Sequence, residues 1–278
     1  MDSSGRADNS GSERSSSPSA AGIYDYLLGG TNWTEVDRQA AEALNALNPD
    51  YPLREIAWIN RGFVQRAAKW LGSVAGVDQI IDLGAGLPTV QNTHQIVGPG
   101  TRVVYVDHDP AAVEYGQRLL DEASVRDAVY FHGDIRDPGL LDHPELRRLI
   151  DLDRPVGVLL IGLLYFIPDE ADPWALVAGL VDKLAPGSYI ALSHNITDHF
   201  VPERVDTTAA AYGRASDHDV YPRPTAEVAR FFEGLEIVPP YEGAPARLDY
   251  ITLWGADDPV EADDDPGRTF VAAVARKP

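Results

Sequence analysis

The stretch QIIDLGAGLPT, residues 79–89, constrains the fold of this chain more than any other. A short apolar run that meets an acidic residue and two glycines is typical of a buried parallel strand entering a tight turn. Gly84 and Gly86 lack side chains, so the backbone can bend sharply there and a ligand can lie against it. Asp82 can accept hydrogen bonds from the turn or from a cationic group. The stretch predicts a ligand site, with a purely structural glycine turn as the alternative.

A second apolar strand, residues 102–107, ends at Asp107, one strand-helix-strand unit after Asp82. A carboxylate at this position is expected to accept hydrogen bonds from the ribose hydroxyls of a nucleoside. A dinucleotide phosphate loop is the alternative, but it needs a third glycine where this chain has Pro88. We therefore predict a ligand with adenosine and no pyrophosphate. S-adenosylmethionine is the main candidate, and NAD is the weakest.

The composition narrows the range of partners. The 278 residues suit one elaborated α/β domain. The net charge of -20 disfavours duplex nucleic acid and anionic membranes, and leaves nucleosides and neutral or cationic small molecules as ligands. The absence of cysteine excludes disulfides, thiolate zinc sites and cysteine nucleophiles. The apolar run 156–167 is too short to cross a bilayer, and the serine-rich start lacks the apolar core of a secretion signal. We expect a cytoplasmic protein.

The chain divides into three parts. Residues 1–20 are predicted to be a disordered tail, because they are rich in Ser and Gly. Residues 21–75 are predicted to form a helical cap, because apolar side chains recur at intervals of three and four along 36–47 and 56–70. Residues 76–278 are predicted to form a Rossmann-like domain. Further helices are expected at 201–215 and 225–232, and late strands at 235–238, 248–253 and 270–275.

The segment around Gly29 and Gly30 has two interpretations. The two glycines can end a short helix, with Tyr24 covering the sheet. Alternatively, Tyr24 and the glycines belong to a flexible polar flap that closes over a ligand and excludes water. Sequence chemistry alone leaves both open.

A third strand, residues 128–131, leads to Asp134 and Ile135. Asp134 can accept a hydrogen bond from the adenine amino group while Ile135 packs on the ring, although a capping aspartate in an ordinary loop is the alternative. We also assign His108, Gly162 and Leu163 to the cofactor site, since each directly follows a predicted strand.

Two residues are candidates for catalysis. Methyltransferases that act on base amino groups commonly carry a polar residue after the central strand, where this chain has Leu163 and Leu164. Tyr165 follows, and an aromatic residue there is more often a wall for the substrate than a base. His194, at the end of the predicted strand 188–193, is a candidate proton acceptor, because its ordinary pKa lies near neutrality.

We predict no metal site. His194, Asp198 and His199 lie close in sequence, but their spacing in a predicted loop does not suit metal ligation. The acidic segment 257–265 is predicted to be a solvated loop, since Pro259 and a missing glycine spoil the pattern of a calcium loop.

In combination, several motifs resemble the actinobacterial S-adenosylmethionine methyltransferase family that was once catalogued only as a domain of unknown function. The resemblance covers residue 21 to the end. The motifs are YDYLLGG at 24–30, NRGF at 60–63, DLGAGLPT at 82–89 with NTH at 92–94, VYVD at 104–107, FIPD at 166–169, and PGSY at 186–189 through Ser193 and His194.

The resemblance implies a class I methyltransferase fold, with a seven-stranded, mostly parallel sheet, helices on both faces and an antiparallel last strand. It implies that Gly84, Gly86, Asp107 and Asp134 line the cofactor site, and it favours the same role for Tyr24, Gly29 and Gly30. We predict methyl transfer from S-adenosylmethionine to an unidentified small molecule. The alternatives are a non-catalytic module that binds this cofactor or its demethylated product, and an enzyme that uses another group of it.

Overall fold

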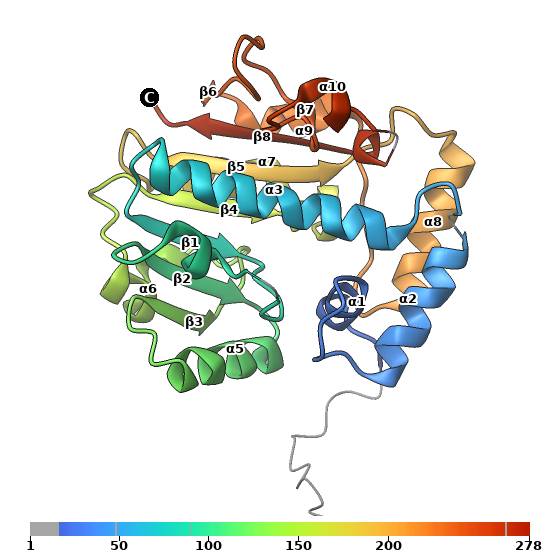
Figure 1. Cartoon of the computed structure of the whole chain (residues 1–278), viewed down its shortest axis with the longest axis horizontal. Coiled ribbons are helices and arrows are strands. Elements are labelled where there is room, and N and C mark those ends of the chain that lie inside the picture. Colours follow the sequence, from blue (N-terminus) through green and yellow to red (C-terminus); the bar gives the residue numbers. More distant parts are fainter. Residues whose placement is uncertain (1–16, 48, 90, 265) are drawn as a thin grey trace, which may run out of the picture.

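The computed structural model describes residues 17–47, 49–89, 91–264 and 266–278. Within these residues the chain forms one eight-stranded sheet with helices on both faces (Figure 1). The strands are β1 (Gln79–Leu83), β2 (Arg102–Asp107), β3 (Ala128–His132), β4 (Gly157–Ile161), β5 (Tyr189–Asn195), β6 (Glu236–Ile237), β7 (Asp249–Tyr250) and β8 (Phe270–Arg276).

The strand order is β3-β2-β1-β4-β5-β8-β6, with β7 paired to β8. Strands β1 to β5 run parallel to one another, and β8 runs antiparallel to β5. This confirms the expected class I arrangement. The sheet has one strand more than predicted, because the short β7 adds a second ladder to β8. The strand expected at 248–253 is therefore only two residues long.

The helices begin where the sequence supplies capping residues and prolines. Pro110, Pro173 and Pro202 each occupy the first helical position, where a missing N–H costs no hydrogen bond. The helices are α1 (Ala20–Leu27), α2 (Glu35–Leu47), α3 (Leu53–Ser73), α4 (Thr93–Val97), α5 (Pro110–Glu122), α6 (Pro144–Leu149), α7 (Pro173–Asp182), α8 (Pro202–Ala215), α9 (Thr225–Ala229) and α10 (Pro259–Ala262). The acidic segment at 257–265, predicted to be a loop, thus contains one helical turn.

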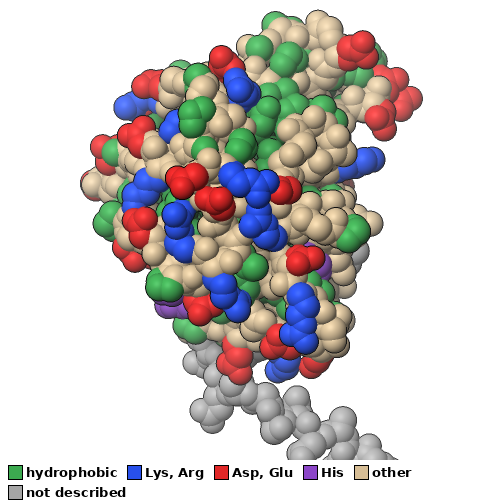
Figure 2. Space-filling view, turned by 90° about the vertical axis from the view of Figure 1, so that its left-hand side faces the viewer, with side chains coloured by type: hydrophobic (Ala, Val, Ile, Leu, Met, Phe, Trp, Pro, Cys, Tyr) green, Lys and Arg blue, Asp and Glu red, His purple; other side chains and the backbone are tan. Residues whose placement is uncertain are grey.

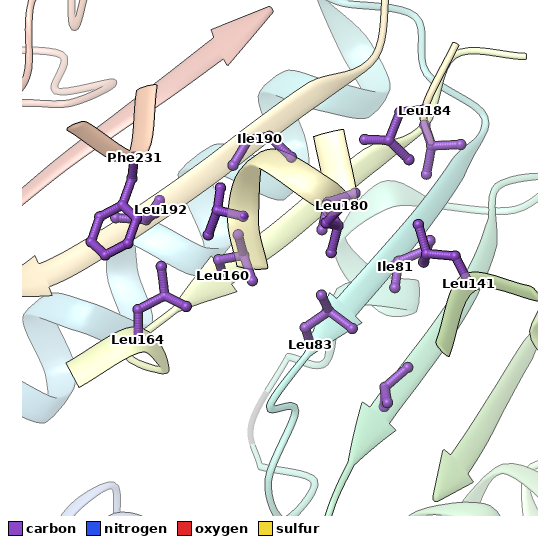
Figure 3. Packing of buried hydrophobic residues seen from close by; sticks show 14 of the residues in the cluster. Ile81, Leu83, Leu141, Leu160, Leu164, Leu180, Leu184, Ile190, Leu192 and Phe231 are labelled. Carbon is purple, nitrogen blue, oxygen red and sulfur yellow. The ribbon is translucent and has the colours of Figure 1, made fainter. Parts of the chain in front are cut away.

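Two apolar layers cover the two faces of the sheet. Ile81 and Leu160 face the layer that contains α7 and Phe231 (Figure 3). Their neighbours Ile80 and Leu159 point to the opposite face and pack with α3. This alternation follows from the two-residue period of a strand, and burial on both faces explains the continuous apolar runs.

A third apolar cluster joins α1, α2 and α8 at one end of the molecule (Figure 1). Ile23, Leu44 and Ala211 are among its buried members. This cluster joins α8 to α1 and α2 of the segment 21–75, which was predicted to form a helical cap, whereas Phe63 and Leu71 of α3 pack on the sheet. Of the predicted tail, residues 1–16 lie outside the described residues. Ser19 already belongs to the fold, since its hydroxyl accepts a hydrogen bond from the N–H of Gly22 at 3.0 Å.

Acidic and basic side chains lie side by side on the face shown in Figure 2. Charge pairs also occur on the cap helices, where Arg38 pairs with Glu35 and Glu42 along α2. Among the described helices, none combines the length and apolarity that crossing a bilayer requires.

Candidate functional site

The turn after β1 is built around its two glycines. Gly84 and Gly86 have φ angles of 70° and 63°, a region that other residues enter only at a cost. The N–H groups of Gly84 and Ala85 donate to the carbonyl of Val106, at 2.8 and 3.1 Å, and so fasten the turn to β2. A Cβ atom on Gly84 would lie 2.7 Å from Cδ1 of Leu163. Glycine is therefore required here by both conformation and space.

Asp107 is buried at the end of β2 and is held by the backbone around it. Its Oδ2 accepts from the N–H of Gly86 at 2.7 Å, and its Oδ1 accepts from the N–H of Asp109 at 2.9 Å. Each carboxylate oxygen has two lone pairs, so one on each remains for a ligand hydroxyl. The carboxylate is thus fixed in orientation before any ligand binds.

His108 lies beside this carboxylate. Its Nδ1 is 3.4 Å from Oδ1 of Asp107, and this contact raises the pKa of His108. Its Nε2 is 3.0 Å from Nε2 of His218, which belongs to the loop after α8. The two imidazoles therefore connect the end of β2 with the helical cap.

A cavity of about 600 Å³, open on one side, lies at these strand ends. We call it the strand-end cavity. Six of the predicted cofactor residues line it: Gly84, Asp107, His108, Asp134, Ile135 and Leu163. The sequence prediction that they gather at one edge of the sheet is consistent with this placement.

Asp134 already has a partner within the strand-end cavity. Nε of Arg136 donates to its two carboxylate oxygens at 2.9 and 3.0 Å. This pairing lowers the pKa of Asp134, so its carboxylate stays ionised. An adenine amino group at this position would share the carboxylate with Arg136.

Asp82 lies beneath the glycine turn and does not line the cavity. Its Oδ2 accepts from the hydroxyl of Thr93, at the start of α4, at 2.7 Å. Burial raises the pKa of Asp82 to about 6, against the opposing effects of Thr93 and Arg61. The carboxylate is therefore ionised at neutral pH at an energetic cost, which a nearby cationic ligand would reduce.

A second, larger cavity lies between α1, α3, α8 and the ends of β5 and β8. It encloses about 1150 Å³, including part of its open side. We call it the apolar cavity, because its walls are mainly aliphatic and aromatic. Its lining includes Tyr24, Ile56, Phe200, Val205, Tyr212 and Phe270.

Tyr24, predicted to contact the cofactor, lines the apolar cavity. Its hydroxyl donates to the carbonyl of Ala57 at 3.2 Å. Gly29 and Gly30 line neither cavity. The N–H of Gly30 donates to the carbonyl of Asp25 at 2.9 Å, as expected for a glycine that ends a helix. This geometry favours the structural interpretation of the glycine pair.

The segment 162–166 contributes to both cavities, and we call it the wall. Gly162, predicted to contact the cofactor, lines neither cavity; its φ angle is 66°, and a Cβ atom there would lie 2.9 Å from Nδ2 of Asn60 and 3.3 Å from the hydroxyl of Tyr165. The N–H of Gly162 donates to Oγ of Ser193 at 3.1 Å, and that hydroxyl donates to Oδ1 of Asn60 at 2.7 Å. Leu163 and Phe166 face the strand-end cavity, whereas Tyr165 faces the apolar one.

Sequence reasoning did not single out Asn60 as a site residue. Asn60 is buried on the apolar face of α3, between Ile56 and Phe63. A polar side chain within an apolar helical stripe needs a hydrogen-bond partner, and this is the signal that could have identified it.

Tyr165 forms part of the wall, as the sequence suggested for an aromatic residue there. Burial raises its pKa well above the ordinary value for tyrosine. The phenol therefore stays protonated at neutral pH and is a poor base.

The surroundings of His194 do not favour the predicted role as a proton acceptor. His194 is fully buried and lines neither cavity. Its Nε2 accepts from Nη1 of Arg223 at 2.9 Å, and its Nδ1 donates to the carbonyl of Asn195 at 2.7 Å. Burial lowers the pKa of His194 to about 3. Both nitrogens are thus occupied, and the ring is neutral.

His194 also lies inside β5, not in a loop after it. Strand β5 extends to Asn195 because β8 pairs with it there, His194 opposite Val271 and Asn195 opposite Phe270. Within the described part of the chain, no group of three or more His, Cys, Asp or Glu side chains could hold a metal ion.

The sequence model of the S-adenosyl methyltransferase family matches residues 7–278. A putative methyltransferase from Thermobifida fusca YX is 36% identical, with 94% of this chain and 95% of that chain covered and a TM-score of 0.83. A DUF574 family protein from Streptomyces avermitilis MA-4680 is also 36% identical, with 94% and 98% covered and a TM-score of 0.84. No protein with a curated description matches.

These matches agree with the strand order and with the fold. The family resemblance expected from the sequence is confirmed, and so is the cofactor. The chain belongs to the S-adenosyl methyltransferase family and is an S-adenosylmethionine-dependent methyltransferase of the class I fold.

Proposed function

We propose that the strand-end cavity holds S-adenosylmethionine and that the methyl acceptor enters from the apolar cavity. Asp107 would accept the ribose hydroxyls, and Ile135 and Asp134 would contact the adenine. The glycine turn would lie against the methionine end. The observation that carries this proposal is the shared wall, because Tyr165 and Phe166 are consecutive residues that line different cavities.

The fit of the cofactor rests on the close approach at the turn. Any side chain at Gly84 would collide with Leu163, so the backbone itself forms that surface of the cavity. The sulfonium of S-adenosylmethionine supplies a methyl group by in-line displacement and loses its positive charge as it does so. Asp82 would balance that charge in the bound state, and the wall would align the acceptor and exclude water.

We assign Tyr165 and His194 as positioning residues rather than bases. Tyr165 would hold the acceptor through its ring and hydroxyl at the wall. His194 would hold Arg223, whose Nη2 donates to the carbonyl of Ile167 at 2.6 Å behind the same wall. Tyr24 would contact the acceptor more closely than the cofactor, since it lines the apolar cavity.

The acceptor is proposed to be a small molecule, because the apolar cavity is concave and lined mainly by aliphatic and aromatic side chains with a few polar groups, as small-molecule sites are. A cytoplasmic location remains a prediction from the sequence, which cell fractionation would test.

A crystal structure with S-adenosylhomocysteine tests the placement of the cofactor. We expect both ribose hydroxyls within hydrogen-bond distance of Asp107 and the adenine against Ile135. A nucleoside bound elsewhere would contradict the proposal. Acceptor-dependent formation of S-adenosylhomocysteine would then identify substrates.

A further inference from the structure

The charge of the apolar cavity differs from that of the whole chain. The chain carries a net charge of -20, yet among the described residues, those that line this cavity include no Asp or Glu. Its ionisable side chains are Arg204 and four tyrosines: Tyr24, Tyr51, Tyr165 and Tyr212. Burial raises the pKa of Tyr24, Tyr165 and Tyr212, so these phenols are neutral at ordinary pH. The cavity is thus neutral apart from one cation.

Arg204 is held in place by aromatic rings. Its guanidinium lies 5.3 Å from the ring centre of Tyr51 and 5.5 Å from that of Phe200. These two rings meet edge to face at 5.3 Å. The acidic group that faces Arg204 is Asp50, at 3.7 Å and with 73% of its side chain exposed. Such an exposed pair is weak, so an anionic ligand can compete for the guanidinium.

Asn195 is a lining residue of the apolar cavity, and its side-chain oxygen lies just behind the cavity surface. Its Oδ1 is buried and has no hydrogen-bond partner within the described structure. A buried acceptor without a partner costs free energy, and a donor on a ligand would remove that cost. The side chain lines the apolar cavity, next to Ile196 and Phe270.

We propose that the methyl acceptor is a flat aromatic molecule without positive charge, in which an anionic group would bind Arg204 and a hydroxyl would donate to Asn195. This inference rests on the proposed function, which puts the acceptor in the apolar cavity. A cation is disfavoured there, because it would lose its hydration and meet Arg204 instead of a carboxylate. The aromatic lining favours a flat ring system by stacking and edge contacts.

Three naphthalenes of similar size test the charge preference: 2-naphthoate, 2-naphthol and 2-naphthylmethylammonium. Each is titrated by calorimetry into the protein saturated with S-adenosylhomocysteine. We expect 2-naphthoate and 2-naphthol to bind, and the ammonium compound to bind at least about ten-fold more weakly. Equal affinity for the ammonium compound and the naphthoate would overturn the inference.

Variants of the two polar residues test the contacts. Arg204→Gln should weaken the binding of 2-naphthoate about ten-fold and leave the binding of 2-naphthol unchanged. Asn195→Leu should weaken the binding of 2-naphthol about five-fold and leave the binding of naphthalene itself unchanged. Arg214→Gln, which changes an exposed arginine of the same helix, is the control and should alter nothing. Unchanged binding of the naphthoate by Arg204→Gln would overturn the assignment.

The location of binding is tested by filling the cavity. Thr208→Trp should abolish binding of all the naphthalenes and leave S-adenosylhomocysteine binding intact, since Thr208 lines the apolar cavity. Thr207→Trp, at an exposed position one residue earlier, is the matched control. If the naphthalenes bind but S-adenosylmethionine does not, only the proposed function is contradicted. If S-adenosylmethionine binds but none of the naphthalenes does, only this inference is contradicted.

Discussion

The two cavities of this methyltransferase are built in different ways. The strand-end cavity is formed by the segments that directly follow β1 to β4, and it carries Asp107, His108, Asp134 and Arg136. The apolar cavity is assembled from helices far apart in the sequence, and its lining has one charged side chain, Arg204. The sheet itself therefore provides the polar cavity, whereas the helices added to the sheet provide the apolar one. Under the proposed function, changes in the helices would alter the acceptor without disturbing the cofactor.

The wall between the cavities should be the most sensitive part of the molecule. Arg223 is buried behind it and donates to the carbonyl of Ile167 at 2.6 Å and to Oδ1 of Asp169 at 2.7 Å. Arg223→Gln leaves these acceptors and His194 without a partner. We expect the free energy of unfolding to fall by about 3 to 5 kcal/mol, because the buried acceptors on Ile167 and His194 both lose a charged donor. Urea denaturation measures the loss.

Arg230→Gln provides the matched control for this change. Arg230 pairs with Glu227 at 2.6 Å, but the side chains of both residues are more than 40% exposed. The expected loss is below about 1 kcal/mol. Equal losses for the two variants would mean that the wall is not held by Arg223.

His194 should support the wall as a neutral group. The folded pKa of His194 is about 3, below its ordinary 6.5, so its contribution to stability is present above pH 6.5 and is lost as the pH falls. Between pH 6.5 and 4 this loss amounts to about 3 kcal/mol. His194→Gln should show a correspondingly shallower loss of stability on acidification. Thermal unfolding across this range measures it, and identical slopes would count against a buried neutral imidazole.

The contribution of Asp82, below the glycine turn, to the pH dependence of stability should have the opposite sign. Its folded pKa of about 6 lies above the ordinary 3.8, so stability is lost as the pH rises from about 3.8 through 6. Asp82→Asn keeps an acceptor for Thr93 and removes the charge. We expect a gain of about 1 to 3 kcal/mol at pH 7 and almost none at pH 3.5. Asp78→Asn, at an exposed pair just before β1, should show no such pH-dependent gain.

The smallest expected effect on stability concerns the glycine turn. Gly84 and Gly76 have nearly the same φ angle, 70° and 68°, so alanine at either position should cost about 1 to 2 kcal/mol. Only Gly84 would place its Cβ against Leu163, because nothing lies within 4 Å of a Cβ at Gly76. Gly84→Ala should therefore also weaken the binding of S-adenosylmethionine at least about ten-fold, while Gly76→Ala should leave this binding unchanged. Equal affinities, measured by calorimetry, would remove the turn from the cofactor site.

The cofactor side could be predicted from the sequence because its geometry is local. A glycine turn after a strand and an acid at the end of the next strand meet at one sheet edge whenever the strands are parallel and adjacent. The pairing of β1 with β2 satisfies this condition for Gly84 and Asp107. The fold class follows from the same alternation of strands and helices.

The apolar cavity and the wall beside it could not be predicted from the sequence, because their contacts join distant segments. The sequence makes His194 a candidate base, because the ordinary pKa of histidine lies near neutrality. In the structure, however, Arg223, 29 residues later, donates to its Nε2. Asn60 lies in α3, and Ser193, its hydrogen-bond partner at the wall, lies 133 residues away. Such pairings depend on how the cap packs on the sheet, which the periodicity of the sequence does not determine.

The most direct test of the cofactor site is a calorimetric titration of S-adenosylmethionine into the parent protein, Asp107→Ala and Asp109→Ala. Asp109 is the neighbouring carboxylate, which caps α5 through the N–H of Ala111 and does not line the cavity. We expect Asp107→Ala to lose about 100-fold in affinity, the effect of two hydrogen bonds to a charged group, and Asp109→Ala to keep that of the parent. The same dissociation constant for the parent and Asp107→Ala, or no binding by the parent, would contradict a nucleoside held by Asp107.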